Sequence, residues 1–422
     1  MTATAYVDSP QAREALHRRT LKVVMASQVF SGAGLAAGVT VGALLAEDML
    51  GTTSLSGLPA ALFTFGSAGA ALAVGRLSHR LGRRAGLTAG YAAGALGGAG
   101  VVLAAVLDNV ALLLLSLLVY GAGTATNLQA RYAGADLVGA DRRGRAVSSV
   151  LVATTLGAVA GPNLVTATGR AAERWSIPGL AGPFALATIA YGLAGTILFL
   201  LLRPDPLQIS RTLPPEPADT ANPPAQGRRF AGSVTAGAAT MVLTQLVMVA
   251  VMTMTPVHMK AHGHGLAATG LVIALHIAGM YLPSLVTGIL VDRIGRVPVA
   301  VAAGATLLAA GIISAAAPEH SVALLALALI LLGLGWNLGL VSGTAMITDA
   351  APQATRAKTQ GAVDLCVALA GAGGGIASGL VVSATSYATL SIAGGILALG
   401  VIPFVATQSR YHSTDEVQAG QG

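Results

Sequence analysis

The sequence predicts an all-α membrane protein with twelve transmembrane helices, arranged as two six-helix bundles related by pseudo-symmetry. Of its 422 residues, 54% are hydrophobic and 10% are charged, which is unlike the composition of a soluble domain. Twelve apolar segments are each long enough to cross a bilayer, for which about 20 residues are needed. They lack the period-two alternation of a membrane barrel, so we expect helices. Related positions also recur at a constant offset of 213 residues.

The segments divide the chain into five regions. They lie near residues 20–46, 54–77, 85–107, 110–135, 146–168, 179–202, 232–257, 266–290, 297–317, 321–347, 359–383 and 387–406. We therefore expect a cytoplasmic arm over 1–19, a first bundle over 20–202, a linker over 203–231, a second bundle over 232–406 and a cytoplasmic tail over 407–422. The linker contains seven of the 18 prolines and should be extended and mobile.

The basic residues predict the orientation in the membrane. If the N-terminus is cytoplasmic, 21 of the 24 Lys and Arg residues lie on the cytoplasmic side, and Arg170, Arg174 and Lys260 lie outside. This bias agrees with the positive-inside rule. The net charge of +7 then reflects topology and attraction to an anionic leaflet, and does not call for nucleic acid. We expect a multi-pass protein of the cell (inner) membrane with both termini cytoplasmic.

One short stretch occurs twice and organises the sequence. The copies run from Gly75 to Arg84 and from Gly288 to Arg296, and each joins two apolar segments. Its matched positions are Gly75 and Gly288, His79 and Asp292, Arg80 and Arg293, Gly82 and Gly295, and Arg83 and Arg296. The same offset pairs Asp136 with Asp349, Arg143 with Arg356, and Arg145 with Lys358. The two halves therefore repeat one six-helix unit.

The repeated stretch resembles the loop signature of the major facilitator superfamily, Gly-x-x-x-Asp-Arg-x-Gly-Arg-Arg/Lys. The second copy has the acid of this signature, Asp292, whereas the first copy has His79 there. The resemblance implies a secondary transporter in which the loop acid and arginines brace the inward-closed state against a neighbouring helix. In the first copy, either this brace is missing or an imidazole makes it depend on protonation.

The fourth and fifth segments contain candidate functional positions. Tyr120, Asn127 and Arg131 lie on one face of a helix, and an arginine at membrane depth either faces a site or extends to the inner surface. Gly157, Gly161 and Pro162 resemble the Gly-x-x-x-Gly-Pro motif that marks drug/proton antiporters of the superfamily. The alternative for this motif is an ordinary packing bend.

The second half offers a parallel set of candidates. Gln245, Met248 and Met252 share a face of the seventh segment, which suits an adaptable binding wall or simple bundle packing. His276, Trp336 and Asn337 are polar or amphipathic groups within apolar segments, and we count them as substrate-binding candidates.

Two groups are candidates for proton coupling. Asp364 is the preferred candidate, because a carboxylate among apolar helices takes up a proton readily. His276 is the second choice. The alternative for Asp364 is a structural charge cluster with Lys358 or with the loop of Asp292 and Arg293.

Several classes of function are excluded. None of the three lysines follows a glycine, so no P-loop is present, and no hydrolase triad or metalloprotease motif stands out. We expect no enzyme activity, cofactor, metal, nucleotide or nucleic acid. The expected function is alternating-access export of a small amphipathic organic compound or drug, driven by the proton motive force. The alternatives are a proton-coupled uptake symporter for a small metabolite and, less favoured, a lipid flippase or a non-transport membrane protein.

Overall fold

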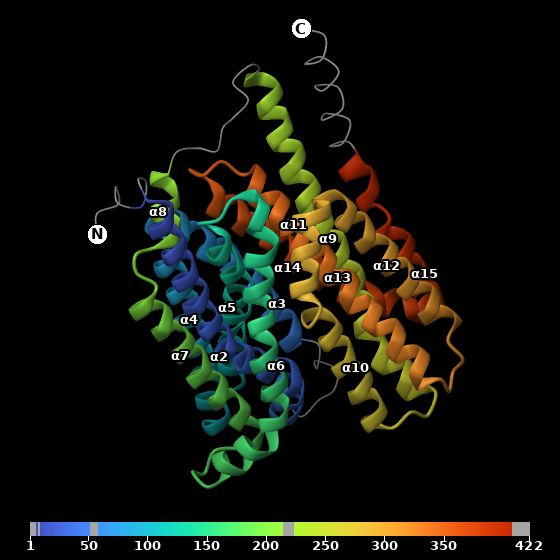
Figure 1. Cartoon of the computed structure of the whole chain (residues 1–422). Coiled ribbons are helices and arrows are strands. Elements are labelled where there is room, and N and C mark those ends of the chain that lie inside the picture. Colours follow the sequence, from blue (N-terminus) through green and yellow to red (C-terminus); the bar gives the residue numbers. More distant parts are fainter. Residues whose placement is uncertain (1–5, 7–8, 51–57, 214–222, 407–422) are drawn as a thin grey trace. The chain divides into compact units, whose positions relative to one another are not determined.

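The computed structural model describes residues 6, 9–50, 58–213 and 223–406, and every regular element in these ranges is a helix (Figure 1). The α-helices are α2 (Pro10–Leu50), α3 (Leu58–Leu81), α4 (Arg83–Val106), α5 (Val110–Ala135), α6 (Arg143–Glu173), α7 (Gly182–Leu201), α8 (Pro206–Thr212), α9 (Pro223–Ala261), α10 (Leu266–Tyr281), α11 (Ser284–Ile294), α12 (Arg296–Ala316), α13 (Val322–Ala350), α14 (Arg356–Ala384) and α15 (Tyr387–Ala398). Two short 3-10 helices, η1 (Ala140–Arg142) and η2 (Gly179–Ala181), precede α6 and α7.

The helices confirm the predicted all-α membrane class. Ten helical segments of the described chain are long and apolar enough to cross a membrane. They correspond to the expected second to fourth and sixth to twelfth segments, while α2 and α6 lie at the expected first and fifth. The eighth segment is divided, because α10 ends at Tyr281 and α11 begins at Ser284.

The chain forms two compact units, and each unit includes a short segment from the other half of the sequence. Unit 1 contains residues 1–138, 149–214 and 353–369, and unit 2 contains 139–148, 215–352 and 370–422. The start of α14 therefore belongs to unit 1, and the start of α6 belongs to unit 2.

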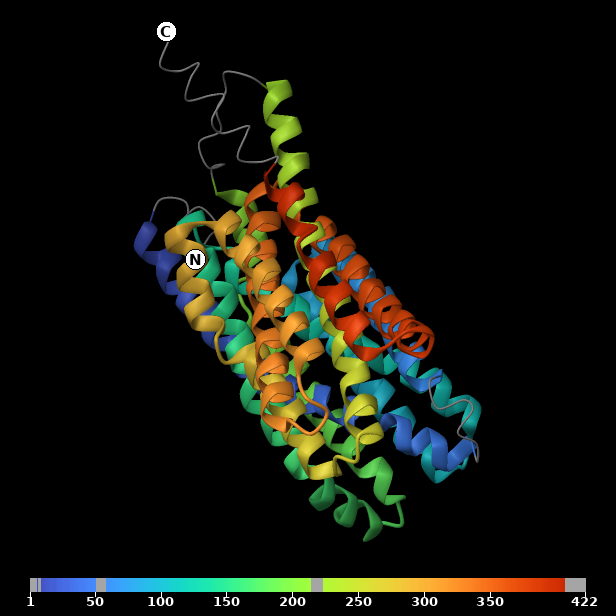
Figure 2. The same cartoon turned by 90° about the vertical axis from the view of Figure 1, so that its right-hand side faces the viewer.

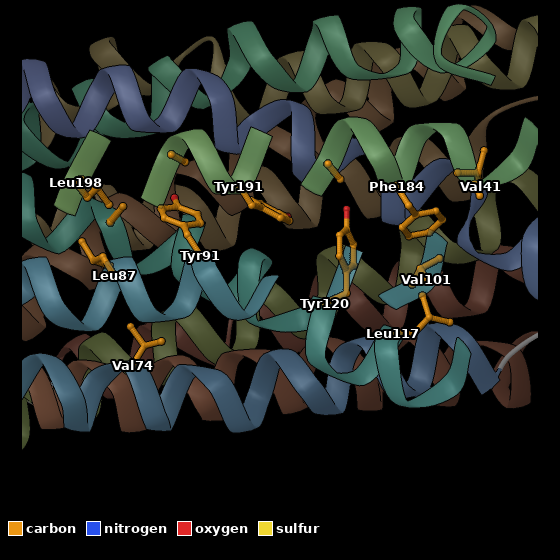
Figure 3. Close-up of a cluster of buried hydrophobic side chains, with 14 of the residues drawn as sticks. Val41, Val74, Leu87, Tyr91, Val101, Leu117, Tyr120, Phe184, Tyr191 and Leu198 are labelled. Atoms are coloured by element: carbon orange, nitrogen blue, oxygen red, sulfur yellow. The ribbon is translucent and has the colours of Figure 1, made fainter. Parts of the chain in front are cut away.

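In unit 1, α4 packs on α5 and α7, while α2 packs on α7 and α3 on α5. Tyr120, Phe184 and Tyr191 lie at the centre of its buried apolar core (Figure 3). Large apolar side chains such as Leu96 and Ile189 are exposed instead, as expected for helices whose outer faces contact lipid.

In unit 2, α13 packs against α9, α10 and α12, and α12 also packs against α15. Figure 2 shows these helices, coloured from yellow-green to red, running side by side. Most of α13 is buried, including Trp336 and Asn337.

The two signature loops share an unusual backbone conformation. Gly82 and Gly295 both have φ of 95°, with ψ of 168° and 167°, and each one precedes the first residue of a helix. Side chains disfavour this left-handed region, so glycine is required for so tight a turn.

The expectation of an extended linker is wrong over two stretches. Residues 206–212 form α8, and α9 begins at Pro223 within the proline-rich region. Asp205 explains α8, because its carboxylate accepts hydrogen bonds from the amides of Leu207 (3.0 Å) and Gln208 (3.2 Å). Proline is also well tolerated in the first turn of a helix, where its missing amide donor would have no helical partner.

Candidate functional site

The two copies of the signature form the same ion pair. In unit 1, Arg83 Nε donates to Asp136 Oδ2 at 2.8 Å and its Nη2 donates to Oδ1 at 3.2 Å. In unit 2, Arg296 Nε donates to Asp349 Oδ2 at 2.8 Å. The partners are 53 residues apart in both copies, so the repeat in the sequence is also a repeat in the structure.

The two ion pairs differ in burial. The side chains of Arg83 and Asp136 are 1% and 0% exposed, whereas those of Arg296 and Asp349 are 20% and 27% exposed. Arg83 also donates to Gln360, at the start of α14. A second matched pair of signature arginines, Arg80 and Arg293, is exposed.

Each signature begins at a glycine that lies against a segment from the other half of the sequence. A Cβ atom on Gly75 would lie 2.7 Å from Gly361 Cα and 3.0 Å from the carbonyl oxygen of Ala357. A Cβ atom on Gly288 would lie 2.6 Å from the carbonyl oxygen of Gly144, which is the position corresponding to Ala357. Glycine therefore permits the start of α14 in unit 1, and the start of α6 in unit 2, to approach closely.

The position that differs between the copies also has different partners. Asp292 accepts hydrogen bonds from the amides of Gly144 (2.8 Å) and Arg145 (3.0 Å), and so caps the N-terminus of α6. His79 lies instead beside Arg211 of α8, which donates to its carbonyl oxygen (2.8 Å) and lies 3.2 Å from its Nδ1.

A second ion pair is buried in unit 1. Arg131 Nη2 lies 2.7 Å from Asp364 Oδ1, and the two side chains are 0% and 2% exposed. The hydroxyl of Tyr132 donates to the same oxygen at 3.2 Å, while Asp364 Oδ2 has no hydrogen-bond partner among the described groups. Arg131 thus faces protein, and its side chain does not extend to the surface.

Tyr132 connects the two charge pairs of unit 1. The guanidinium carbons of Arg83 and Arg131 lie 5.5 and 4.2 Å from its ring centroid. Gln360 and Asp364, which bind these arginines, are one turn apart on α14.

The Arg131–Asp364 pair is not repeated in unit 2. The offset of 213 places Thr344 at the position of Arg131, Ala345 at that of Tyr132 and Leu151 at that of Asp364. The duplication therefore explains Arg83–Asp136 and Arg296–Asp349, but not this pair.

The remaining candidates of α5 lie in the interior of unit 1. The Tyr120 ring contacts Phe184 and Tyr191, with centroid distances of 5.4 and 5.6 Å (Figure 3). The side-chain Nδ2 of Asn127 donates to Ser31 Oγ at 2.7 Å, and the backbone carbonyl of Asn127 accepts from Gln28 Nε2 at 3.0 Å. Tyr120, Asn127 and Arg131 consequently contact different partners, although they share one face of the helix.

In unit 2, the polar candidates of α9 and α13 meet. Trp336 Nε1 donates to Gln245 Oε1 at 2.6 Å, and the Tyr281 ring lies edge-on to Trp336 with a centroid distance of 5.8 Å. Gln245 and Met252 are partly exposed, whereas Met248 is buried. The arrangement presents an indole, a phenol and an amide together.

Asn337 forms hydrogen bonds with residues on both sides of the break between α10 and α11. Its amide nitrogen donates to the Met280 carbonyl and to Ser284 Oγ, and its oxygen accepts from Thr287, each at 2.7 Å. The break frees backbone groups that a continuous helix would pair, and Asn337 supplies a donor for one of them. Its amide is thus committed to the fold.

His276 is fully buried within unit 2. Its Nδ1 lies 2.8 Å from the Leu329 carbonyl of α13, so this nitrogen carries the proton, since a carbonyl only accepts. Its Nε2 has no partner among the described groups.

The Gly-x-x-x-Gly-Pro motif lies within α6, which is assigned as one helix through these residues. A Cβ atom on Gly157 would lie 2.6 Å from the amide nitrogen of Ala33, so α2 packs closely there. The surroundings of Gly161 and of the Pro162 side chain lie outside the described set.

Sequence reasoning missed Gln28, Tyr91, Tyr132, Gln360 and Arg211. Gln28 receives a hydrogen bond from Tyr91 at 2.6 Å, and Gln360 binds Arg83. The spacing of four between Gln360 and Asp364 was a usable signal for a shared helix face. The others are polar residues that sequence spacing does not connect.

A duplicated set of membrane helices with an ion pair at each loop signature defines a polytopic membrane protein built from two related halves. The family model described as Major Facilitator Superfamily matches residues 23–282 and 237–420. The chain belongs to this superfamily. It is therefore a multi-pass membrane transporter and not an enzyme.

Individual relatives agree with this assignment. The MFS-type transporter YdeG of Bacillus subtilis is 58% identical over 405 residues, covering 95% of this chain and 94% of that protein. The riboflavin transporter RfnT of Brucella anthropi is 31% identical over 397 residues, covering 92% and 95%. The crystal structure of the human organic anion transporter MFSD10 has a TM-score of 0.75 at 16% identity, covering 92% of this chain and 99% of that one, which shows a shared fold.

Proposed function

We propose that the protein is a proton-coupled secondary transporter of the cell membrane that exports a small, planar, amphipathic organic compound. The observation that carries proton coupling is the buried Arg131–Asp364 ion pair, which has no counterpart in unit 2. Pairs that occur in both halves are explained by a shared structural task, whereas a buried pair found in one half calls for a separate role.

The chemistry of the pair suits proton uptake. Asp364 binds Arg131 and Tyr132 through Oδ1, and its Oδ2 has no partner within the part of the chain that the structure describes, so a proton can bind Oδ2 without displacing one of these donors. Protonation neutralises the carboxylate and removes the charge of Asp364 from beside the buried Arg131 guanidinium. The first turns of α14 then lose an attractive contact in unit 1, which links a proton to a helix movement.

The substrate class follows from Gln245, Trp336 and Tyr281. An indole and a phenol, both buried in this structure, lie beside the partly exposed Gln245, and flat aromatic rings next to an amide are the groups that bind planar compounds with polar edges. Riboflavin, the compound in the name of the relative RfnT, combines a planar ring system with a polar chain. This favours a heteroaromatic compound of similar shape.

Orientation and transport cycle complete the proposal. The bias of basic residues supports cytoplasmic N- and C-termini. The duplicated halves support alternating access by two bundles, approximately 20–202 and 232–406, joined by the linker.

Proteoliposomes with an imposed pH gradient test direction and coupling together, with riboflavin as the first probe. An acidic lumen should drive riboflavin inward by exchange, whereas accumulation driven by an acidic exterior would establish symport instead. Symport is the second candidate, since a vitamin is a compound that cells also take up.

D364N should abolish accumulation driven by the gradient while riboflavin still binds. The matched control is D141N, because the Asp141 side chain is 77% exposed and takes no part in the buried pair. Unchanged pH-driven accumulation in D364N refutes coupling through Asp364. If riboflavin is not bound, comparing compounds exported by cells with and without the gene identifies the substrate.

A further inference from the structure

The residue that caps α6 has a histidine as its counterpart in the other half of the sequence. Asp292 binds the amides of Gly144 and Arg145, whose counterparts at the offset of 213 are Ala357 and Lys358 of α14. The close approaches of Gly75 and Gly288 show that the two helix starts are placed alike in their units. The counterpart of Asp292 is His79, so the first copy of the signature has no carboxylate at the position that caps α6 in unit 2.

His79 is held by α8 instead. A guanidinium only donates hydrogen bonds, so Nδ1 of His79 acts as the acceptor in its contact with Arg211. The same short helix and its N-cap residue bind the loop at two further points: the cap, Asp205, accepts from the Arg84 amide at 2.7 Å, and Gln208 donates to the Leu81 carbonyl at 3.0 Å.

These contacts bind the loop to α8 and to Asp205. The start of α14 is bound in unit 1 through side chains, including Gln360 with Arg83 and Asp364 with Arg131 and Tyr132. A carboxylate at position 79 would add attraction to the helix N-terminus whatever the state of Asp364. Without it, the charged contact at Asp364 carries a larger share of the binding.

We propose that His79 weakens the hold of unit 1 on the first turns of α14, residues 356–364, so that the protonation of Asp364 decides whether they stay docked. Helix α8 keeps the signature loop in place while these turns release. The inference rests on the proposed coupling through Asp364 and assigns His79 as a positioning residue for it.

Hydrogen–deuterium exchange of the full-length protein in lipid nanodiscs tests this without transport. D364N should raise exchange in residues 356–364 by about tenfold. H79D should lower it by about fivefold, and H79D/D364N should return close to the wild-type rate. H79N, whose neutral oxygen accepts amide hydrogen bonds more weakly, should give a smaller decrease than H79D.

R76N is the matched control, because it lowers the net charge by one, as H79D does, at an exposed position on the same helix. It should leave exchange in 356–364 unchanged, and unaltered exchange in α7 verifies folding of each variant. The proposal is overturned if D364N does not increase exchange, or if H79D/D364N exchanges as fast as D364N. If the exchange pattern holds but D364N still couples transport to protons, the proposed coupling fails while the docking role of His79 stands.

Discussion

The same loop ion pair occurs twice at different depths of burial, so the same substitution should have unequal costs. D136N removes a charge but keeps the side-chain shape and one carbonyl oxygen. It leaves the Arg83 guanidinium, 1% exposed, without a counter-ion, for which we expect a loss of about 3–5 kcal/mol. D349N makes the same change where Asp349 is 27% exposed and its two partners, Arg296 and Arg143, are 20% and 6% exposed, and solvent at the carboxylate and at Arg296 limits the loss to about 1–3 kcal/mol.

Thermal unfolding in detergent, followed by tryptophan fluorescence, measures the difference. A gap of about 2 kcal/mol should lower the midpoint of D136N by about 5 °C relative to D349N. D141N is the control, since its side chain is 77% exposed and should leave the midpoint unchanged. Equal losses for D136N and D349N, or a larger loss for D349N, would show that burial does not set the strength of these pairs.

Three further outcomes are expected. N337L should lower the free energy of unfolding by about 2–3 kcal/mol, because three hydrogen bonds at the α10–α11 break are lost. Each kcal/mol lowers the unfolding midpoint by about 2–4 °C, so a midpoint within about 1 °C of the wild type would contradict this. G75A should destabilise the protein or reduce transport, since its Cβ would lie 2.7 Å from Gly361, whereas G69A has open space and should be neutral in both assays. Q245L removes the acceptor of the Trp336 indole and should shift the tryptophan emission and weaken riboflavin binding, measured by fluorescence titration; unchanged emission would show that the bond is not formed in solution.

Some features of the molecule were readable from the chain itself. The apolar segments specified membrane helices, because backbone groups in lipid must be paired within the segment. The offset of 213 placed Arg83 and Arg296 in equivalent positions, and in the structure each pairs with an aspartate 53 residues further along the chain. Asp364 was singled out because a carboxylate in an apolar segment is costly and needs a reason.

The partners of these groups were decided by tertiary structure. Asp364 pairs with Arg131, 233 residues away, and spacing along one helix says nothing about which helix lies opposite. Asn337 looked available for a ligand, yet its amide is consumed at a helix break that hydropathy does not reveal. Proline content suggested an extended linker, but the carboxylate of Asp205 caps α8 within it.

The sequence by itself thus determined the class, the membrane segments and the internal repeat, since these depend on local composition and on spacing. Tertiary structure alone decided that His79 faces Arg211, and that a buried carboxylate shares an oxygen between an arginine and a tyrosine. The physical reason is that hydrophobicity acts on every residue independently of its distant neighbours. Charge pairing and capping act over a few ångströms between groups that only the folded chain brings together.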